Sequence, residues 1–96
     1  MTEELTFTDV ADRSRYELRR GDELVSVLDY ERRGDTIALT RAFTIPAHRG
    51  HGFAGVVTER AVDAIEALGG RRILPVCWYV AEWFDTHPER RAMLEG

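Results

Sequence analysis

A glycine-rich stretch in the middle of the chain has the composition of an anion-binding loop. It covers residues 46–55, with the sequence PAHRGHGFAG, and joins a predicted strand to the start of a predicted helix. The first N–H groups of a helix have no intrahelical partner and carry the positive end of the helix dipole. Glycines let an anion approach these groups closely, and Arg49 adds a mobile positive charge, so the stretch suits a pyrophosphate. The alternative is a glycine-rich turn that only starts an ordinary helix.

Two common phosphate-binding motifs do not account for this stretch. The pattern G-x-x-x-x-G-K-[ST] requires a lysine, and the chain contains none. Gly50, Gly52 and Gly55 have the spacing of G-x-G-x-x-G, but that motif needs a βαβ unit, whereas the preceding strands are predicted to form an antiparallel meander. Binding of a mononucleotide or of a dinucleotide is therefore disfavoured.

The single cysteine, Cys77, is the strongest candidate for a reactive side chain. It excludes an internal disulfide and a multi-cysteine metal cluster. A thiol near the start of the following predicted helix has a favourable place for thiolate chemistry, although a free cysteine often only fills a core. His48, His51 and His87 show no zinc-ligand spacing beyond a loop His-x-x-His, so we expect no metal site.

Length and composition indicate a globular protein. The 96 residues suffice for one core and not for two, so we expect a single domain over residues 1–96. There are 13 basic and 17 acidic residues, a net charge of −4, which disfavours nucleic acid as a partner. No apolar run has the length of a membrane span, and the acidic start lacks the pattern of a signal peptide. We therefore expect a cytoplasmic protein that does not bind a membrane.

All 13 basic residues are arginine. The absence of lysine excludes Schiff-base chemistry, whereas the planar guanidinium suits phosphate or carboxylate recognition. Four arginine pairs, at 19–20, 32–33, 71–72 and 90–91, lie beside predicted turns or termini. We interpret them as solvated ends of elements rather than as a binding patch.

The hydrophobic pattern changes period near the glycine stretch. Alternation predicts strands over residues 5–7, 15–19, 23–30 and 36–45, and Pro46 ends this meander. Apolar spacing of three and four predicts a helix over residues 53–68, which Gly69 and Gly70 terminate. A short strand over 72–77, a helix over 78–87 and a fraying tail over 89–96 follow, and Pro75 suggests an edge strand. The predicted fold class is α+β, with helices packed on a mostly antiparallel sheet.

The ordered set of motifs resembles the small single-domain branch of the GCN5-related N-acetyltransferases. This branch includes short bacterial proteins and eukaryotic N-acetyltransferase domain-containing proteins. The resemblance covers about residues 5–92 and rests on Arg49-x-x-Gly52-x-Ala54 together with several flanking segments. These are Leu28-Asp29-Tyr30, Ile45-Pro46, Pro75-Val76-Cys77, Val80-Ala81 and His87-Pro88-Glu89.

The resemblance implies acetyl-CoA as the cosubstrate and a set of residues that bind it. The CoA arm would lie between two splayed strands, where backbone groups near Thr44 and Ile45 pair with the pantetheine amides. Arg49 would face a phosphate, unless it is only a solvated loop charge. Cys77 would lie at the thioester end as a candidate catalytic acetyl acceptor. The N–H groups implied for the pyrophosphate are those of Gly50, His51, Gly52, Phe53 and Ala54. For His51 the simpler interpretation is a spacer that contributes only its N–H.

The chain departs from this family at two positions that bear on catalysis. Related sequences commonly carry a histidine and a glutamate where Ala42 and Thr44 stand, and neither residue present here can serve as a general base. A water is one remaining candidate for acid–base work. The candidate side chains are Glu82, Asp85, His87 and, as an acid, Tyr79. Larger family members add N-terminal helices that wall the acceptor pocket, so here we expect an open acceptor side.

Three functions remain open at this stage. The first is an acetyl-CoA-dependent N-acetyltransferase that acts on an unidentified amine, either a small molecule or a protein. The second is a module that binds CoA or acyl-CoA with little or no transfer. The third is a small interaction domain that uses an exposed sheet edge. The sequence does not define the oligomeric state, and a monomer is compatible with it.

Overall fold

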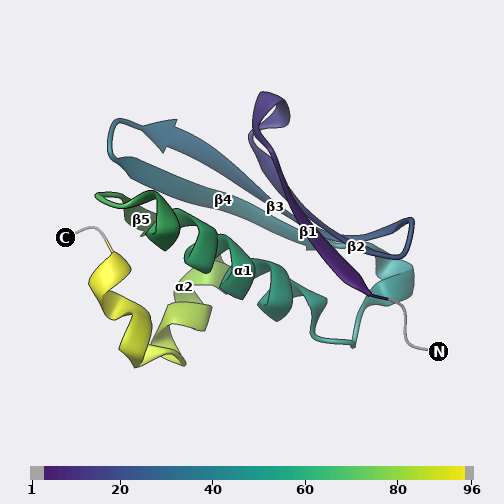
Figure 1. Ribbon diagram of the computed structural model, residues 1–96. Coiled ribbons are helices and arrows are strands. Elements are labelled where there is room, and N and C mark those ends of the chain that lie inside the picture. The colour runs from purple at the N-terminus through teal and green to yellow at the C-terminus, as the bar shows by residue number, and fades with distance from the viewer. Residues whose placement is uncertain (1–3, 95–96) are drawn as a thin grey trace.

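A five-stranded sheet carries two α-helices on one face in the computed structural model, which describes residues 4–94 (Figure 1). The strands lie in chain order from β1 to β5, and the helices follow β4 and β5. Their bounds are β1 Leu5–Val10, β2 Arg15–Arg20, β3 Glu23–Arg33, β4 Thr36–Thr44, α1 Phe53–Leu68, β5 Arg72–Pro75 and α2 Trp78–Asp85. Short 3₁₀ helices occupy Ala11–Arg13 (η1), Pro46–His48 (η2) and Pro88–Met93 (η3).

The pairing of the strands confirms the predicted α+β class with a mostly antiparallel sheet. β1 to β4 pair antiparallel, and β5 joins the edge of the sheet parallel to β4. Pro75 is the last residue of this edge strand, where a proline costs no ladder hydrogen bond.

The core lies between the sheet and α1. The helix spans Phe53–Leu68, as its apolar spacing predicts, and turns Val57, Ala61 and Ile65 onto the sheet. Leu18 and Leu28 face it from β2 and β3 and are fully buried. Burial of a Val, Leu or Ile side chain contributes about 1.5–3 kcal/mol, so this layer fixes the position of α1 over β2, β3 and β4.

Several element ends differ from the sequence-based prediction. β1 runs to Val10 rather than residue 7, because it pairs with β2 along its whole length. β5 ends at Pro75 and α2 at Asp85, two residues earlier than predicted in each case. The predicted fraying of the tail is wrong as far as Leu94, because η3 forms there and Met93 is buried; residues 95–96 lie outside the described residues.

The interpretation of the arginine pairs as solvated ends does not fit all eight side chains, because four of them are partly buried, namely Arg19, Arg20, Arg71 and Arg90. Arg90 is only 18% exposed and forms ion pairs with Asp63 (2.9 Å) and Glu66 (3.4 Å) of α1. Arg20 is half-buried against the ring of Phe53. Both arginines connect segments that are distant in the sequence, which a local pattern does not reveal.

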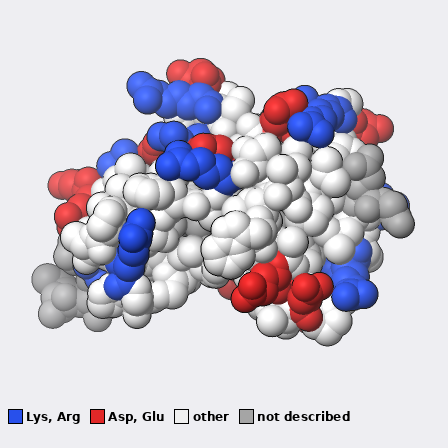
Figure 2. Space-filling view, turned by 180° about the vertical axis from the view of Figure 1, so that it is seen from behind, with Lys and Arg blue, Asp and Glu red and all other residues white. Residues whose placement is uncertain are grey.

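Charged side chains of both signs are interspersed on the side of the molecule seen in Figure 2, around a central uncharged area. Some charges of opposite sign form ion pairs, and Asp29 lies 3.0 Å from Arg15 and 3.9 Å from Arg41. Among residues 4–94, no helix is both long enough and apolar enough to span a bilayer.

Candidate functional site

The loop between η2 and α1 has the backbone geometry of an anion-binding turn. Gly50 and Gly52 have positive φ angles of 86° and 76°, which glycine adopts without strain. A Cβ added to either glycine would meet no atom within 4 Å, so the space beside them is open. Gly52 is the N-cap of α1 and no side chain caps the helix there, which leaves its first N–H groups available to a ligand.

Beside this loop, the pairing of β4 with β5 stops halfway along β4. The register runs from Thr36 opposite Arg72 to Leu39 opposite Pro75. One further hydrogen bond, from the Cys77 N–H to the Leu39 carbonyl (2.9 Å), closes the pairing. Within residues 4–94 no strand continues it, so the outer edge of β4 is uncovered from residue 40 to residue 44.

A β-bulge decides which backbone groups of β4 face this uncovered edge. Arg41 pairs with Asp29 and Leu39 with Tyr30, so Thr40 is the extra residue. Because a bulge reverses the alternation of the backbone, Ala42 and Thr44 direct their N–H and C=O groups outward. The Thr44 carbonyl accordingly accepts a hydrogen bond from Arg49 Nε (3.3 Å), outside the β3–β4 ladder.

The same geometry separates the two predicted backbone positions. The backbone groups of Thr44 face the uncovered edge. Those of Ile45 do not, because the Ile45 N–H donates to the Val25 carbonyl (2.9 Å) and its carbonyl accepts from the His48 N–H (2.8 Å). Ala42 takes its place as the second outward position, and the sequence holds no local signal for the bulge that places it there.

Two side chains of the loop, those of Arg49 and His51, have different surroundings. The exposed side chain of Arg49 lies over the uncovered edge, with its guanidinium carbon 5.7 Å from the centroid of Phe43. The His51 ring stacks on Phe53 at 5.6 Å between centroids, which favours a spacer role for this side chain. The loop therefore offers backbone N–H groups and one guanidinium to an anion.

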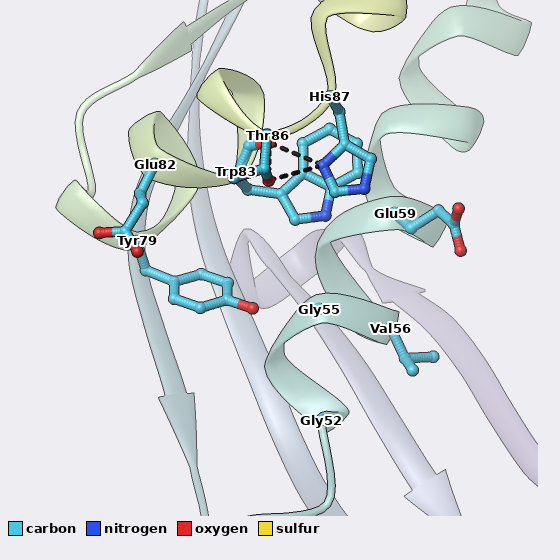
Figure 3. A pocket seen from close by; sticks show the side chains of 9 residues that line it. All are labelled: Gly52, Gly55, Val56, Glu59, Tyr79, Glu82, Trp83, Thr86 and His87. Atoms are coloured by element: carbon cyan, nitrogen blue, oxygen red, sulfur yellow. Dashed lines mark hydrogen bonds between the residues drawn. The ribbon is translucent and has the colours of Figure 1, made fainter.

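A groove of about 380 Å³ runs between α1 and α2 and meets the loop at Gly52 (Figure 3). The phenol of Tyr79 lies over Gly55, and a Cβ on Gly55 would sit 3.3 Å from its oxygen. The N-cap Gly52 and the α1 residues Gly55 and Glu59 are spaced by three and four, so they lie on one face of the helix and line the groove. This spacing is a local sequence signal for the groove that the sequence analysis missed. The groove is lined by Gly52, Gly55, Val56, Glu59, Tyr79, Glu82, Trp83, Thr86 and His87.

Three of the four candidate acid–base side chains line this groove, namely Tyr79, Glu82 and His87. Asp85 is not among the lining residues; it lies 3.8 Å from Arg91. Burial and the neighbouring Glu82 carboxylate both raise the pKa of Tyr79. The phenol therefore stays protonated at neutral pH and can donate a hydrogen bond.

His87 is held in one orientation and one neutral tautomer. Its ring stacks on Trp83 with centroids 3.9 Å apart and planes at 13°, and its Nδ1 lies 2.7 Å from the Trp83 carbonyl oxygen. A carbonyl only accepts, so Nδ1 carries the proton in the neutral ring. The lone pair of Nε2 is then the acceptor that the ring offers.

Cys77 lies at the junction of β5 and α2, as the N-cap residue of α2. Its thiol belongs to the core cluster and the residue is only 9% exposed. It lies near the point where β5 leaves β4, but it does not line the groove. Within residues 4–94, no group of three or more His, Cys, Asp or Glu side chains has an arrangement that could hold a metal ion.

Comparison with known proteins agrees with this geometry. Residues 15–93 match a family model described as GCN5-related N-acetyl-transferase. A similar solved structure is the ribosomal-protein-S18-alanine N-acetyltransferase from Escherichia coli, with a TM-score of 0.63 and 13% sequence identity. The match covers 76% of this chain and 50% of that one, so the chain spans about half the length of this structural relative. A search of curated protein sequences found no significant match.

Proposed function

Because the chain belongs to the GCN5-related N-acetyltransferase family, we propose that it binds acetyl-CoA and transfers the acetyl group to an amine. The observation that carries the proposal is the juxtaposition of the open glycine loop with the uncovered edge of β4. The loop N–H groups suit the pyrophosphate, and the outward backbone groups of Ala42 and Thr44 suit the pantetheine amides.

In the transfer step, the nitrogen lone pair of a neutral amine attacks the thioester carbonyl. The N–C bond forms, the C–S bond breaks, and CoA leaves as a thiolate that takes up a proton. Positioning the two reactants lowers the barrier of such a step by removing entropy costs, and N–H groups that polarise the carbonyl lower it further. Tyr79 offers a proton for the thiolate, and His87 or Glu82 offers an acceptor for the proton that the amine loses, directly or through water.

Direct attack is preferred over a route through Cys77. An acetyl-cysteine intermediate requires the thiolate to reach the thioester, whereas this thiol is packed in the core. The acceptor remains unidentified, either a small amine or a protein.

One observation favours a second function, a module that holds CoA or acyl-CoA with little transfer. Ala42 and Thr44 place no carboxylate or imidazole at the uncovered edge, so a base must come from the groove or from water. Binding of CoA without turnover across a panel of amines would select this alternative.

The first experiment is calorimetry of acetyl-CoA binding to the wild-type chain and to Gly52→Val. The matched control is Gly70→Val, because Gly70 has a similar φ of 69° and open space around it but lies beyond the other end of α1. A β-branched residue at positive φ costs about 1–2 kcal/mol of strain at either site. We expect only Gly52→Val to lose binding. Absence of binding to the wild-type chain at millimolar acetyl-CoA would refute the proposal. A small interaction domain would then be the remaining function.

A further inference from the structure

A single arginine contacts both ends of the glycine loop. Arg20, the last residue of β2, donates from its guanidinium to His48 Nδ1 (3.3 Å), at the end of η2. Its guanidinium carbon also lies 5.4 Å from the ring centroid of Phe53, the first residue of α1. The four residues between these contacts, 49–52, are exposed. The side chain of Arg20, from the β2–β3 hairpin, therefore contacts the residue that precedes the exposed loop and the residue that follows it.

His48 is the buried member of this group. It is 6% exposed, and its ring meets that of Phe53 edge-on at 6.4 Å. Arginine only donates, so Nδ1 must accept and the neutral ring carries its proton on Nε2. Nε2 lies 3.1 Å from Glu23 Oε2, at an angle outside that of a hydrogen bond. The ring is thus held between Arg20 of β2, Glu23 of β3 and Phe53 of α1.

We propose that Arg20 and His48 are positioning residues that fix the backbone of the loop in its ligand-binding conformation. The inference rests on the proposed function of this loop. Two glycines at positive φ give the loop many accessible conformations, and ordering them on binding would weaken the affinity for the ligand. Anchoring both ends in the free protein removes part of that cost. Neither residue needs to touch the ligand to have this effect.

The test compares Arg20→Ala with Arg19→Ala in the full chain. Arg19 is the adjacent residue, and its guanidinium bonds to Glu17 and to the Asp22 carbonyl rather than to the loop. We expect acetyl-CoA affinity to fall about tenfold in Arg20→Ala and to stay unchanged in Arg19→Ala. Arg20→Lys keeps the charge without the planar fork, so a loss in this variant too separates positioning from general attraction of an anion.

Two further readouts identify a positioning role. Amide hydrogen exchange of residues 50–53 in the free protein is expected to accelerate in Arg20→Ala and in His48→Ala. His48→Asn, which keeps an acceptor for Arg20, is expected to restore slow exchange. Affinity and exchange in Arg20→Ala equal to those of Arg19→Ala would overturn the inference. Failure of the wild-type chain to bind acetyl-CoA would instead refute the proposed function, and with it a role of this pair toward that ligand.

Discussion

The two halves of β4 differ in what covers them. From Thr36 to Leu39 the strand pairs with β3 on one side and β5 on the other, and Ile37, Ala38 and Leu39 are buried. From residue 40 to residue 44 it pairs with β3 alone and is only partly buried. The first half of β4 thus packs in the core, and the second half has an edge whose backbone groups are free to form hydrogen bonds with a ligand. The change depends on two features, the end of β5 at Pro75 and the bulge at Thr40.

The largest expected effect is a loss of stability in the covered half. Leu39 is fully buried against the core, so Leu39→Ala leaves a cavity and is expected to lower the free energy of unfolding by about 2–5 kcal/mol. Urea unfolding measures this change. Acetyl-CoA affinity of the molecules that remain folded is expected to stay near that of the wild type. A selective loss of affinity would show that the two halves of β4 do not act separately.

A second effect on stability concerns Tyr16 of β2, a buried residue of the inner part of the sheet, and appears at alkaline pH. Burial, the Asp9 carboxylate and Tyr30 raise the pKa of Tyr16 well above its ordinary value of about 10. The contribution of Tyr16 to stability is thus complete below pH 10 and is lost as the pH rises through its folded-state pKa, because the unfolded chain ionises first. Above pH 10 we expect a decline of about 1.4 kcal/mol per pH unit from this group.

Tyr16→Phe isolates this contribution. The variant keeps the ring that packs between Phe7 and Tyr30 but has no phenol to ionise. The free energy of unfolding, measured with urea at several pH values between 9 and 11, should therefore fall less steeply with pH for the variant than for the wild type. Equal slopes would mean that the phenol of Tyr16 reaches solvent in the folded protein.

The contrast between the two regions also explains what the sequence could predict. The bounds of α1 were predictable because apolar spacing and the Gly69-Gly70 stop are local signals. The glycine loop was predictable for the same reason. The uncovered edge was not, because it depends on where residues 72–75 stop pairing with a strand more than thirty residues earlier. Contacts such as Arg20 with His48, or the burial of Met93, likewise arise only after folding.

A pair of proline substitutions tests the direction of the backbone groups in the uncovered half. Ala42→Pro removes an N–H that faces the edge, where a proline is tolerated, and is expected to weaken acetyl-CoA binding about two- to tenfold with a modest change in stability. The neighbouring Arg41→Pro removes an N–H that faces β3 and is expected to destabilise the fold. Calorimetry and urea unfolding report the two effects. Equal destabilisation by both variants would contradict the outward direction of Ala42.

The smallest expected effect concerns Cys77, at the boundary between the two halves. Its backbone closes the covered half through the hydrogen bond to Leu39, which Cys77→Ala preserves. Because the thiol packs in the core, we expect a modest loss of stability and a turnover number within about twofold of the wild type, measured with an accepted amine. A large loss of turnover with acetyl-CoA binding intact would contradict direct transfer and support an acetyl-cysteine intermediate. Cys77 would then be both a core residue and a nucleophile at the end of the uncovered edge. The division of β4 into a half that stabilises the fold and a half that binds the ligand would not hold at this residue.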